Sequence, residues 1–418
     1  MDSFVTEARR ETNPKTMKTN LTHFEDTLSN NLHNLDQVLL VLDPRAHSLG
    51  YLFVLKAKIN DQRKNPQSYI AQVTTFLSAC NAEFVQAAPT QFCQVCRHYT
   101  DLLFQVRQPS RGVLPLRRAL GMLITSSTQL TPVHADFLQL CILSKCYHMA
   151  LPVVSQSITD VNPDQTSITI RDVLCYFYYA GIVFSTLKMY RQALDAFRQV
   201  WTAPATAISA IAIEAYKKYY LVFLMMNGTT PGFPNYTPIV VQRAIKNHCK
   251  AYSEFGTSII NGNINEIHAK ASSNAETFSK DNNMGLVKLA IKSIHRRNIK
   301  KLTQTYMTLS IQNIAEHVKL TPTEAEAIVL KMIEDGEIFA TISQKDGMVT
   351  FHENPESYSG HKILNELDHQ VKSVFALDGR LRAMDEKFSV SQAYLKRLVS
   401  SEKKLLQEEQ FAMMEDVM

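Results

Sequence analysis

The fold is decided by residues 309–351, which read LSIQNIAEHVKLTPTEAEAIVLKMIEDGEIFATISQKDGMVTF. Leu309-Ser310-Ile311 is a short apolar run with the character of an extended segment. A helix follows, because Ile314, Ala315 and Val318 recur on one helical face. The segment therefore opens with a short strand that leads into a helix.

A second helix is predicted from its own start and stop signals. Thr321-Pro322-Thr323-Glu324 combines an N-cap threonine, a proline at the first helical position and a glutamate that completes a capping box. Asp335-Gly336 ends the helix, because glycine readily adopts the left-handed conformation of a helix stop. Between these signals lies one apolar stripe, formed by Ala325, Ile328, Val329, Met332 and Ile333.

A hairpin closes the segment. Asp346-Gly347 is a turn signal, and apolar residues alternate on both sides of it. The alternating residues are Ile338, Ala340 and Ile342 before the turn and Val349 and Phe351 after it. Strand, helix, helix and hairpin in this order predict a winged helix, which we place within residues 286–356.

The chain before this module is predicted to be a helical-repeat array. Residues 26–285 follow a short N-terminal segment, 1–25, and carry apolar stripes of helical period separated by short breaks. Phe177-x2-Ala180-Gly181-x2-Phe184, then Ala193-x3-Phe197, approximates the tetratricopeptide pattern, in which small residues let two helices approach. The fold class is therefore mainly α: an irregular, TPR-like solenoid, a winged helix and C-terminal helices.

The C-terminal tail, residues 361–418, carries an apolar seam of 3/4 spacing that lacks a partner in the sequence. The seam contains Leu364, Leu367, Val371, Val374 and Leu381, with Phe375 beside it. A second, polar helix is predicted over about 390–410. We expect the seam to pack against another protein.

Composition narrows the function classes. The net charge of +5 over 418 residues is too small to indicate nucleic-acid binding by itself. The uncharged apolar run 173–187 is shorter than the roughly 18–20 residues that span a bilayer, and no membrane partner is expected. Seven cysteines without framework spacing fit a reducing compartment.

No pattern indicates a catalytic, cofactor or metal site. Cys93-x2-Cys96, close to His98, is the one tempting metal pair, but on a helix both cysteines fit ordinary core positions. No His-x-His pair, phosphate-binding glycine loop or nucleophile elbow occurs. We therefore expect no enzyme activity, no cofactor and no bound metal.

Nucleic-acid binding is the rival hypothesis, since winged helices often place their second helix in the major groove. Residues 288–301 contain six basic residues and no acidic one, a stripe that phosphates would attract. The predicted recognition helix, 322–336, argues against this function, because it carries four acidic residues and one lysine. Nucleic acid remains the alternative partner.

The order of modules resembles the PCI domain of the proteasome lid, the COP signalosome and a translation initiation complex. Eight ordered segments make the resemblance closest to the third-subunit family of the COP signalosome. They are Leu42-Asp43 with His47-Ser48-Leu49-Gly50, Leu130-Thr131-Pro132 with His134-Ala135-Asp136, Cys175-Tyr176 with Tyr178-Tyr179, 214–219 (EAYKKY), 281–288 (DNNMGLVK), 332–340 (MIEDGEIFA), 345–349 (KDGMV), and Leu381-x-Ala383-Met384-Asp385.

The resemblance implies a non-catalytic scaffold in a complex that removes a ubiquitin-like modifier from the cullins of cullin-RING ubiquitin ligases. Its expected partners are other signalosome subunits, of PCI and metalloprotease type, and its expected location is the cytoplasm and nucleus. PCI subunits of the proteasome lid or an initiation complex remain alternatives. The predicted interface comprises Leu309, Ile311, Ile338, Ala340 and Ile342, for edge pairing of winged helices, and Leu364, Leu367, Val371, Val374, Phe375 and Leu381, for a helical bundle.

Overall fold

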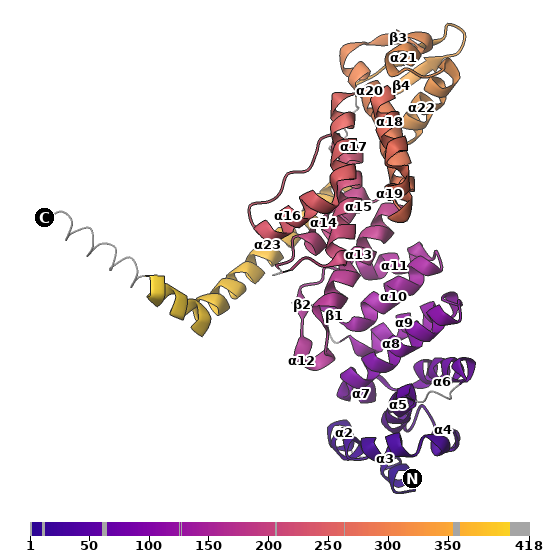
Figure 1. The fold of residues 1–418 in the computed structure, drawn as a ribbon, viewed down its shortest axis with the longest axis vertical. Helices are drawn as coiled ribbons and strands as arrows, with labels where there is room; N and C mark the ends of the chain where they lie inside the picture. Colours follow the sequence, from indigo (N-terminus) through magenta and orange to yellow (C-terminus); the bar gives the residue numbers. More distant parts are fainter. Residues whose placement is uncertain are drawn as a thin grey trace, which may run out of the picture. The chain divides into compact units, whose positions relative to one another are not determined.

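The computed structural model describes residues 2–10, 13–60, 65–124, 126, 128–204, 207–262, 264–353 and 360–401 (Figure 1). The chain forms two compact units, Met1–Lys301 and Leu302–Met418, and each is described by itself. Within the described residues, no helix is both long and apolar enough to cross a membrane.

The first unit is a stack of helices (Figure 1). Its elements are α1 Asp2–Ala8, α2 Pro14–Thr22, α3 Glu25–Asn30, η1 Leu32–Asn34, α4 Leu35–Val41, α5 Ser48–Ala57, η2 Lys58–Asn60, α6 Pro66–Ala79, α7 Ala82–Ala87, α8 Pro89–Gln105, α9 Ser110–Leu123, β1 Gln129–Leu130, α10 Pro132–Leu143, α11 Tyr147–Val154, β2 Asp160–Val161, α12 Pro163–Thr166, α13 Ile170–Thr186, α14 Tyr190–Trp201, α15 Ala210–Asn227, α16 Ile239–His248, α17 Lys250–Asn261, α18 Ile264–Ser273, α19 Ala275–Lys280 and α20 Met284–Thr305. The last helix, α20, begins before residue 286 and continues past Lys301.

The tetratricopeptide-like segment forms the helix pair α13 and α14. Lys188 adopts a left-handed φ of 62° in the short link between them. A Cβ atom at Gly181 would lie 2.5 Å from Phe197 Cε1, so only glycine allows this helix approach. Phe197 is fully buried, and Ala180 and Ala193 are also in the core. The prediction that small residues permit close packing while aromatic rings fill the space is confirmed.

The second unit contains the predicted winged helix. Its elements are β3 Thr308–Ser310, α21 Ile311–Val318, α22 Pro322–Glu334, β4 Ala340–Ser343, β5 Met348–Phe351 and α23 His361–Ser389. The strands form one antiparallel sheet in the order β3-β5-β4. Thr321 caps α22 through the predicted capping box with Glu324. Gly347 has a positive φ of 66° in the hairpin turn.

The start of α21 differs from the sequence prediction by one residue. Ile311 is the first helical residue, whereas the sequence assigned it to an extended stretch. Ser310 is the N-cap, and its hydroxyl oxygen accepts a hydrogen bond from the Asn313 backbone N–H. Because this cap begins the helix at the next residue, the strand ends at Ser310.

The tail begins with the long helix α23. Residues 392–401 are helical as well, and the rest of the predicted second helix, up to about 410, lies outside the described residues. The side chains of α23 are exposed along its described length, including every residue of the apolar seam.

Candidate subunit interface and supporting polar networks

Strand β4 lies at one edge of the winged-helix sheet, and its hydrogen bonds define which backbone groups are free. Phe339 O accepts a bond from the His352 N–H at 2.8 Å. Because antiparallel bonded pairs recur every second residue, Thr341 pairs in the same way with Thr350. Ala340 and Ile342 therefore direct their N–H and C=O groups away from β5.

The side chains predicted for this edge differ in exposure. Ala340 and Ile342 are half-buried, whereas Ile338 is only 5% exposed and lies just before β4. Ile338, Phe339 and Ala340 line a hollow of about 450 Å³ together with Ile333, His352 and Glu353. The edge therefore combines free backbone groups with an adjacent hollow that can receive a side chain.

Strand β3 forms the opposite edge. Leu309 is buried, and its backbone faces Val349 of β5. Ile311 is half-buried in α21, away from the strand edge. The outward backbone groups on β3 therefore belong to Thr308 and Ser310, neither of which the sequence singled out.

The structure places the six predicted tail residues on one helix, α23, with exposed fractions from 45% at Val371 to 73% at Phe375. Their spacing puts most of them on a single face. Asp378, which interrupts the seam, forms an ion pair of 3.0 Å with Arg382 in the next turn. Apart from this interruption, the seam is an apolar surface that the described part of the chain does not bury.

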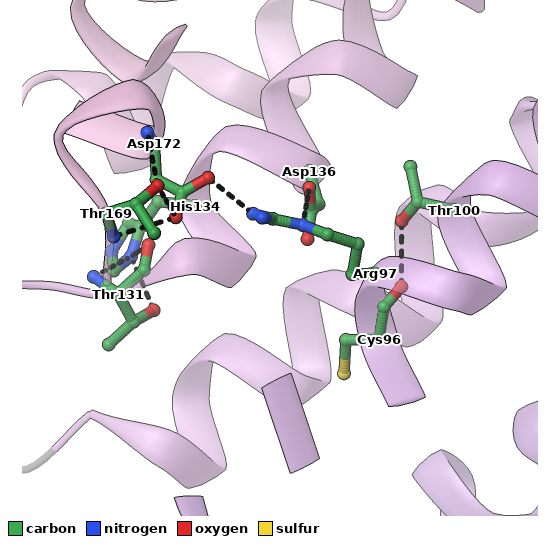
Figure 2. A network of polar contacts seen from close by, with 8 residues as sticks. All are labelled: Cys96, Arg97, Thr100, Thr131, His134, Asp136, Thr169 and Asp172. Atoms are coloured by element: carbon green, nitrogen blue, oxygen red, sulfur yellow. Dashed lines mark hydrogen bonds and ion pairs between the residues drawn. The ribbon is translucent and has the colours of Figure 1, made fainter. Parts of the chain in front are cut away.

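A polar network that sequence reasoning missed connects three helices of the first unit (Figure 2). Arg97 of α8 donates to Asp172 Oδ1 of α13 at 2.7 Å and lies 3.4 Å from Asp136 Oδ1 of α10. Both carboxylates are buried, and Asp136 Oδ2 has no hydrogen-bond partner among the residues that the structure describes. Burial raises the pKa of Asp136 to about 7 despite the nearby guanidinium. This network joins successive helical repeats.

The same region contains two reciprocal caps (Figure 2). His134 Nδ1 accepts from the Thr131 backbone N–H at 3.1 Å, and the Asp172 carboxylate accepts from the Thr169 N–H at 3.0 Å. The His134 ring packs edge to face against the Tyr176 ring, with 5.8 Å between the two ring centroids. Burial lowers the pKa of His134 to about 4, so the ring is neutral at neutral pH.

A second network ties α15 to the residues before α20. Lys217 Nζ lies 2.7 Å from Glu214 Oε1 and 2.8 Å from Asp281 Oδ1. Tyr252 of α17 donates its hydroxyl to Asp281 Oδ2 at 2.7 Å. Two segments recognised in the sequence, 214–219 and 281–288, are therefore direct neighbours.

Cys93 and Cys96 occupy the core positions that the sequence suggested. Cys93 and Cys96 are buried in α8, and burial raises the pKa of the Cys93 thiol to about 12. His98 instead contacts the Tyr69 ring edge to face. Among the residues that the structure describes, no group of three or more histidine, cysteine or carboxylate side chains is placed to hold a metal ion.

Helical repeats together with a winged helix define a PCI-domain protein, and the PCI domain model matches residues 270–353. A second family model, described as COP9 signalosome complex subunit 3, N-terminal helical repeats, matches residues 11–241. The chain is 56% identical over 402 residues to COP9 signalosome complex subunit 3 of Dictyostelium discoideum, covering 96% of both proteins. It is 39% identical over 369 residues to the Arabidopsis thaliana protein of the same name, covering 87% of this chain and 84% of that protein. The chain belongs to the COP9 signalosome complex subunit 3 family.

Proposed function

We propose that this chain is a non-catalytic scaffold subunit of the COP9 signalosome. In this role it supports the removal of a ubiquitin-like modifier from the cullins of cullin-RING ubiquitin ligases. The proposal is supported by the family membership and by the exposed apolar face of α23. Contiguous apolar surface of this kind indicates an interaction site.

The tail is proposed to enter a bundle with helices of other subunits. Leu367, Val371 and Val374 project from one face of α23 and are each 45% to 65% exposed. Burying such a face against a second helix removes apolar area from water, which is the main driving force of association. The opposite face is polar at His369 and Ser373, as a bundle helix requires on its outer side.

The winged helix is proposed to extend its sheet through a neighbouring subunit. The free N–H and C=O groups of Ala340 and Ile342 can pair with an added strand, which fixes the register. The hollow beside Ile338 and Phe339 can then accept one apolar side chain from that strand. Edge pairing and the helical bundle would give this chain two separate attachments.

The sequence alternatives have less support. The recognition-helix position, α22, carries three glutamates and one lysine, which disfavours contact with phosphates. Family membership favours the signalosome over the proteasome lid and the initiation complex. We also propose that the chain resides in the cytoplasm and nucleus, which imaging of a fluorescent fusion tests.

The decisive experiment compares two triple variants of the full chain during co-expression with signalosome subunits. Leu367→Glu, Val371→Glu and Val374→Glu together place charges on the apolar face, and we expect the chain to leave the complex while remaining folded. The control, His369→Glu, Ser373→Glu and Ala376→Glu, adds the same charge to the opposite face and should leave co-purification unchanged. Equal retention of both variants would contradict a bundle role. Chelator-sensitive removal of the modifier from a cullin by the purified chain alone would contradict the non-catalytic role.

A further inference from the structure

Helix α9 of the first unit has an exposed face that neither proposed attachment uses. The helix packs into the core through Val113, Leu116 and Leu120. Its outer side presents Leu114, which is 67% exposed, and Gly121, which is also exposed. These two residues are seven apart, so they lie two helical turns from one another in one row along the outer side.

The surroundings of this row are positively charged. Residues 102–135 contain four arginines and no acidic residue. All four arginines are exposed, and they are Arg107, Arg111, Arg117 and Arg118. Whereas Arg97 of the neighbouring helix α8 pairs with Asp136 and Asp172, none of these four forms an ion pair with a residue that the structure describes. The charge of this surface is therefore not balanced by carboxylates in the described part of the chain.

The arginines of α9 lie on both sides of the row. Arg111 Nη1 donates to Gln67 Oε1 of α6 at 3.3 Å, which directs its guanidinium group toward α6. Arg117 Nη1 lies 3.8 Å from Met149 Sδ of α11, on the other side. Arg118 follows Arg111 by seven residues and therefore lies on the same side as Arg111. The partners of Arg111 and Arg117 are neutral, so both guanidinium groups keep their full charge for a ligand.

We propose that this face of α9 binds an acidic segment of a partner protein, one that carries an apolar residue between its carboxylates. Guanidinium groups bind carboxylates through two parallel hydrogen bonds, and the arginines on either side of the row can each take one carboxylate. The apolar residue would lie against Leu114. A Cβ atom at Gly121 would meet nothing within 4 Å, so the backbone of the segment can approach the helix closely there.

Other anionic surfaces fit this face less well. A lipid surface binds helices that insert several apolar side chains, whereas Leu114 is the one exposed large apolar residue of α9. A nucleic acid would engage the arginines through its phosphates but would give Leu114 no matching apolar group. A protein segment with both carboxylates and an apolar side chain satisfies both parts of the face. This binding goes beyond the scaffold function, because it involves neither the winged helix nor α23.

Fluorescence anisotropy with the full chain tests the proposal. The probe is a fluorescein-labelled peptide that contains two copies of a leucine flanked on either side by two glutamates. One comparison peptide has glutamine in place of every glutamate, and another has serine in place of every leucine. We expect the probe to bind about tenfold more tightly than the glutamine peptide and about fivefold more tightly than the serine peptide, because the first lacks the ion pairs and the second lacks the apolar contact. Equal binding of either comparison peptide, or no binding of the probe, would overturn the proposal.

Variants of the chain locate the site. Because a single exposed ion pair contributes little, the three arginines of α9 are replaced together, and we expect about tenfold weaker binding of the probe. This triple variant is Arg111→Gln, Arg117→Gln and Arg118→Gln. The matched control removes the same charge from exposed positions on α14 and α16, away from α9 (Figure 1), and it is Arg191→Gln, Arg243→Gln and Lys246→Gln. An equal loss in the control would show general attraction by net charge and would overturn the site.

Leu114 provides a test that leaves all charges in place. Leu114→Gln should weaken binding of the probe about fivefold without destabilising the chain, because this side chain is mostly exposed. Unchanged binding would contradict the apolar contact. Competition by duplex DNA or by vesicles with anionic lipid as strong as that of the unlabelled peptide would overturn recognition of a protein segment. These measurements do not require assembly of the signalosome, so their failure leaves the scaffold proposal unaffected.

Discussion

Lys217 Nζ lies 2.8 Å from Asp281 Oδ1, and this ion pair joins α15 to the residues that precede α20. Both side chains are largely buried, with exposed fractions of 11% and 15%. The hydroxyl of Tyr252 donates to the second oxygen of Asp281, so the same carboxylate also connects to α17. This pair holds together three helical elements at the C-terminal end of the first unit.

Removal of the lysine charge should therefore destabilise the first unit. In Lys217→Met, Asp281 and Glu214 remain without their shared cation, and we expect the free energy of unfolding to fall by about 3 kcal/mol. Urea denaturation measures the loss, and hydrogen exchange should show it at α15 and α17. Lys280→Met is the control, because its ion pair with Glu276 is 74% and 82% exposed. Its loss should stay below about 0.5 kcal/mol.

A double-mutant cycle separates the ion pair from other effects of the substitution. Asp281→Asn removes the charge and keeps an acceptor for Tyr252. The variant with both Lys217→Met and Asp281→Asn should lose less stability than the sum of the single variants. Each single variant leaves one buried charge of this pair without its partner, whereas the double variant removes both charges. Strict additivity would mean that the 2.8 Å contact contributes nothing specific.

Two glycine substitutions test the packing of the repeat helices. Gly181→Ala places a methyl group 2.5 Å from Phe197 Cε1, so we expect a loss of about 1–3 kcal/mol in the free energy of unfolding. Gly121 lies on α9 with open space around its Cβ position. Gly121→Ala should therefore be neutral or stabilise by up to about 1 kcal/mol. A similar destabilisation in both variants, measured by thermal unfolding, would contradict the close-approach explanation.

The sequence predicted elements whose signals are local. The capping box of Thr321 and Glu324, the turn at Asp346-Gly347 and the helix pair around Gly181 all depend on residues close along the chain. The boundary error at Ile311 has a local cause as well, since the Ser310 cap competes with the apolar run for the same residues.

The polar networks could not be predicted because their members are distant in the sequence. Arg97, Asp136 and Asp172 lie on three separate helices, and each alone looks like a surface charge. The stacking of the repeats determines which carboxylate pairs with a given arginine. The outward groups of Ala340 and Ile342 likewise follow from the strand order β3-β5-β4, which a hairpin pattern does not specify.

Proline substitutions can show which sheet edge a neighbouring subunit uses. Ala340→Pro removes an outward N–H from β4 without removing a bond to β5, and proline is tolerated at the first residue of an edge strand. Thr308→Pro does the same at the β3 edge. If β4 is the paired edge, Ala340→Pro should weaken co-purification with one neighbour while Thr308→Pro leaves it intact. Circular dichroism verifies that both variants remain folded, and unchanged assembly in both would contradict edge pairing.

The pH dependence of stability should contain two opposing contributions from α10. The pKa of His134 falls from 6.5 to about 4 on folding, so the folded state binds fewer protons between these values and loses stability as the pH falls through them. The pKa of Asp136 rises from 3.8 to about 7, so acidification over that range stabilises the folded state. His134→Asn should therefore make the chain less sensitive to acid, and Asp136→Asn should make it more sensitive. Urea midpoints measured at a series of pH values give the slope of stability against pH for each variant and for the unsubstituted chain. A change of slope in the same direction for both variants would contradict this assignment, because burial acts on a cation in one case and on an anion in the other.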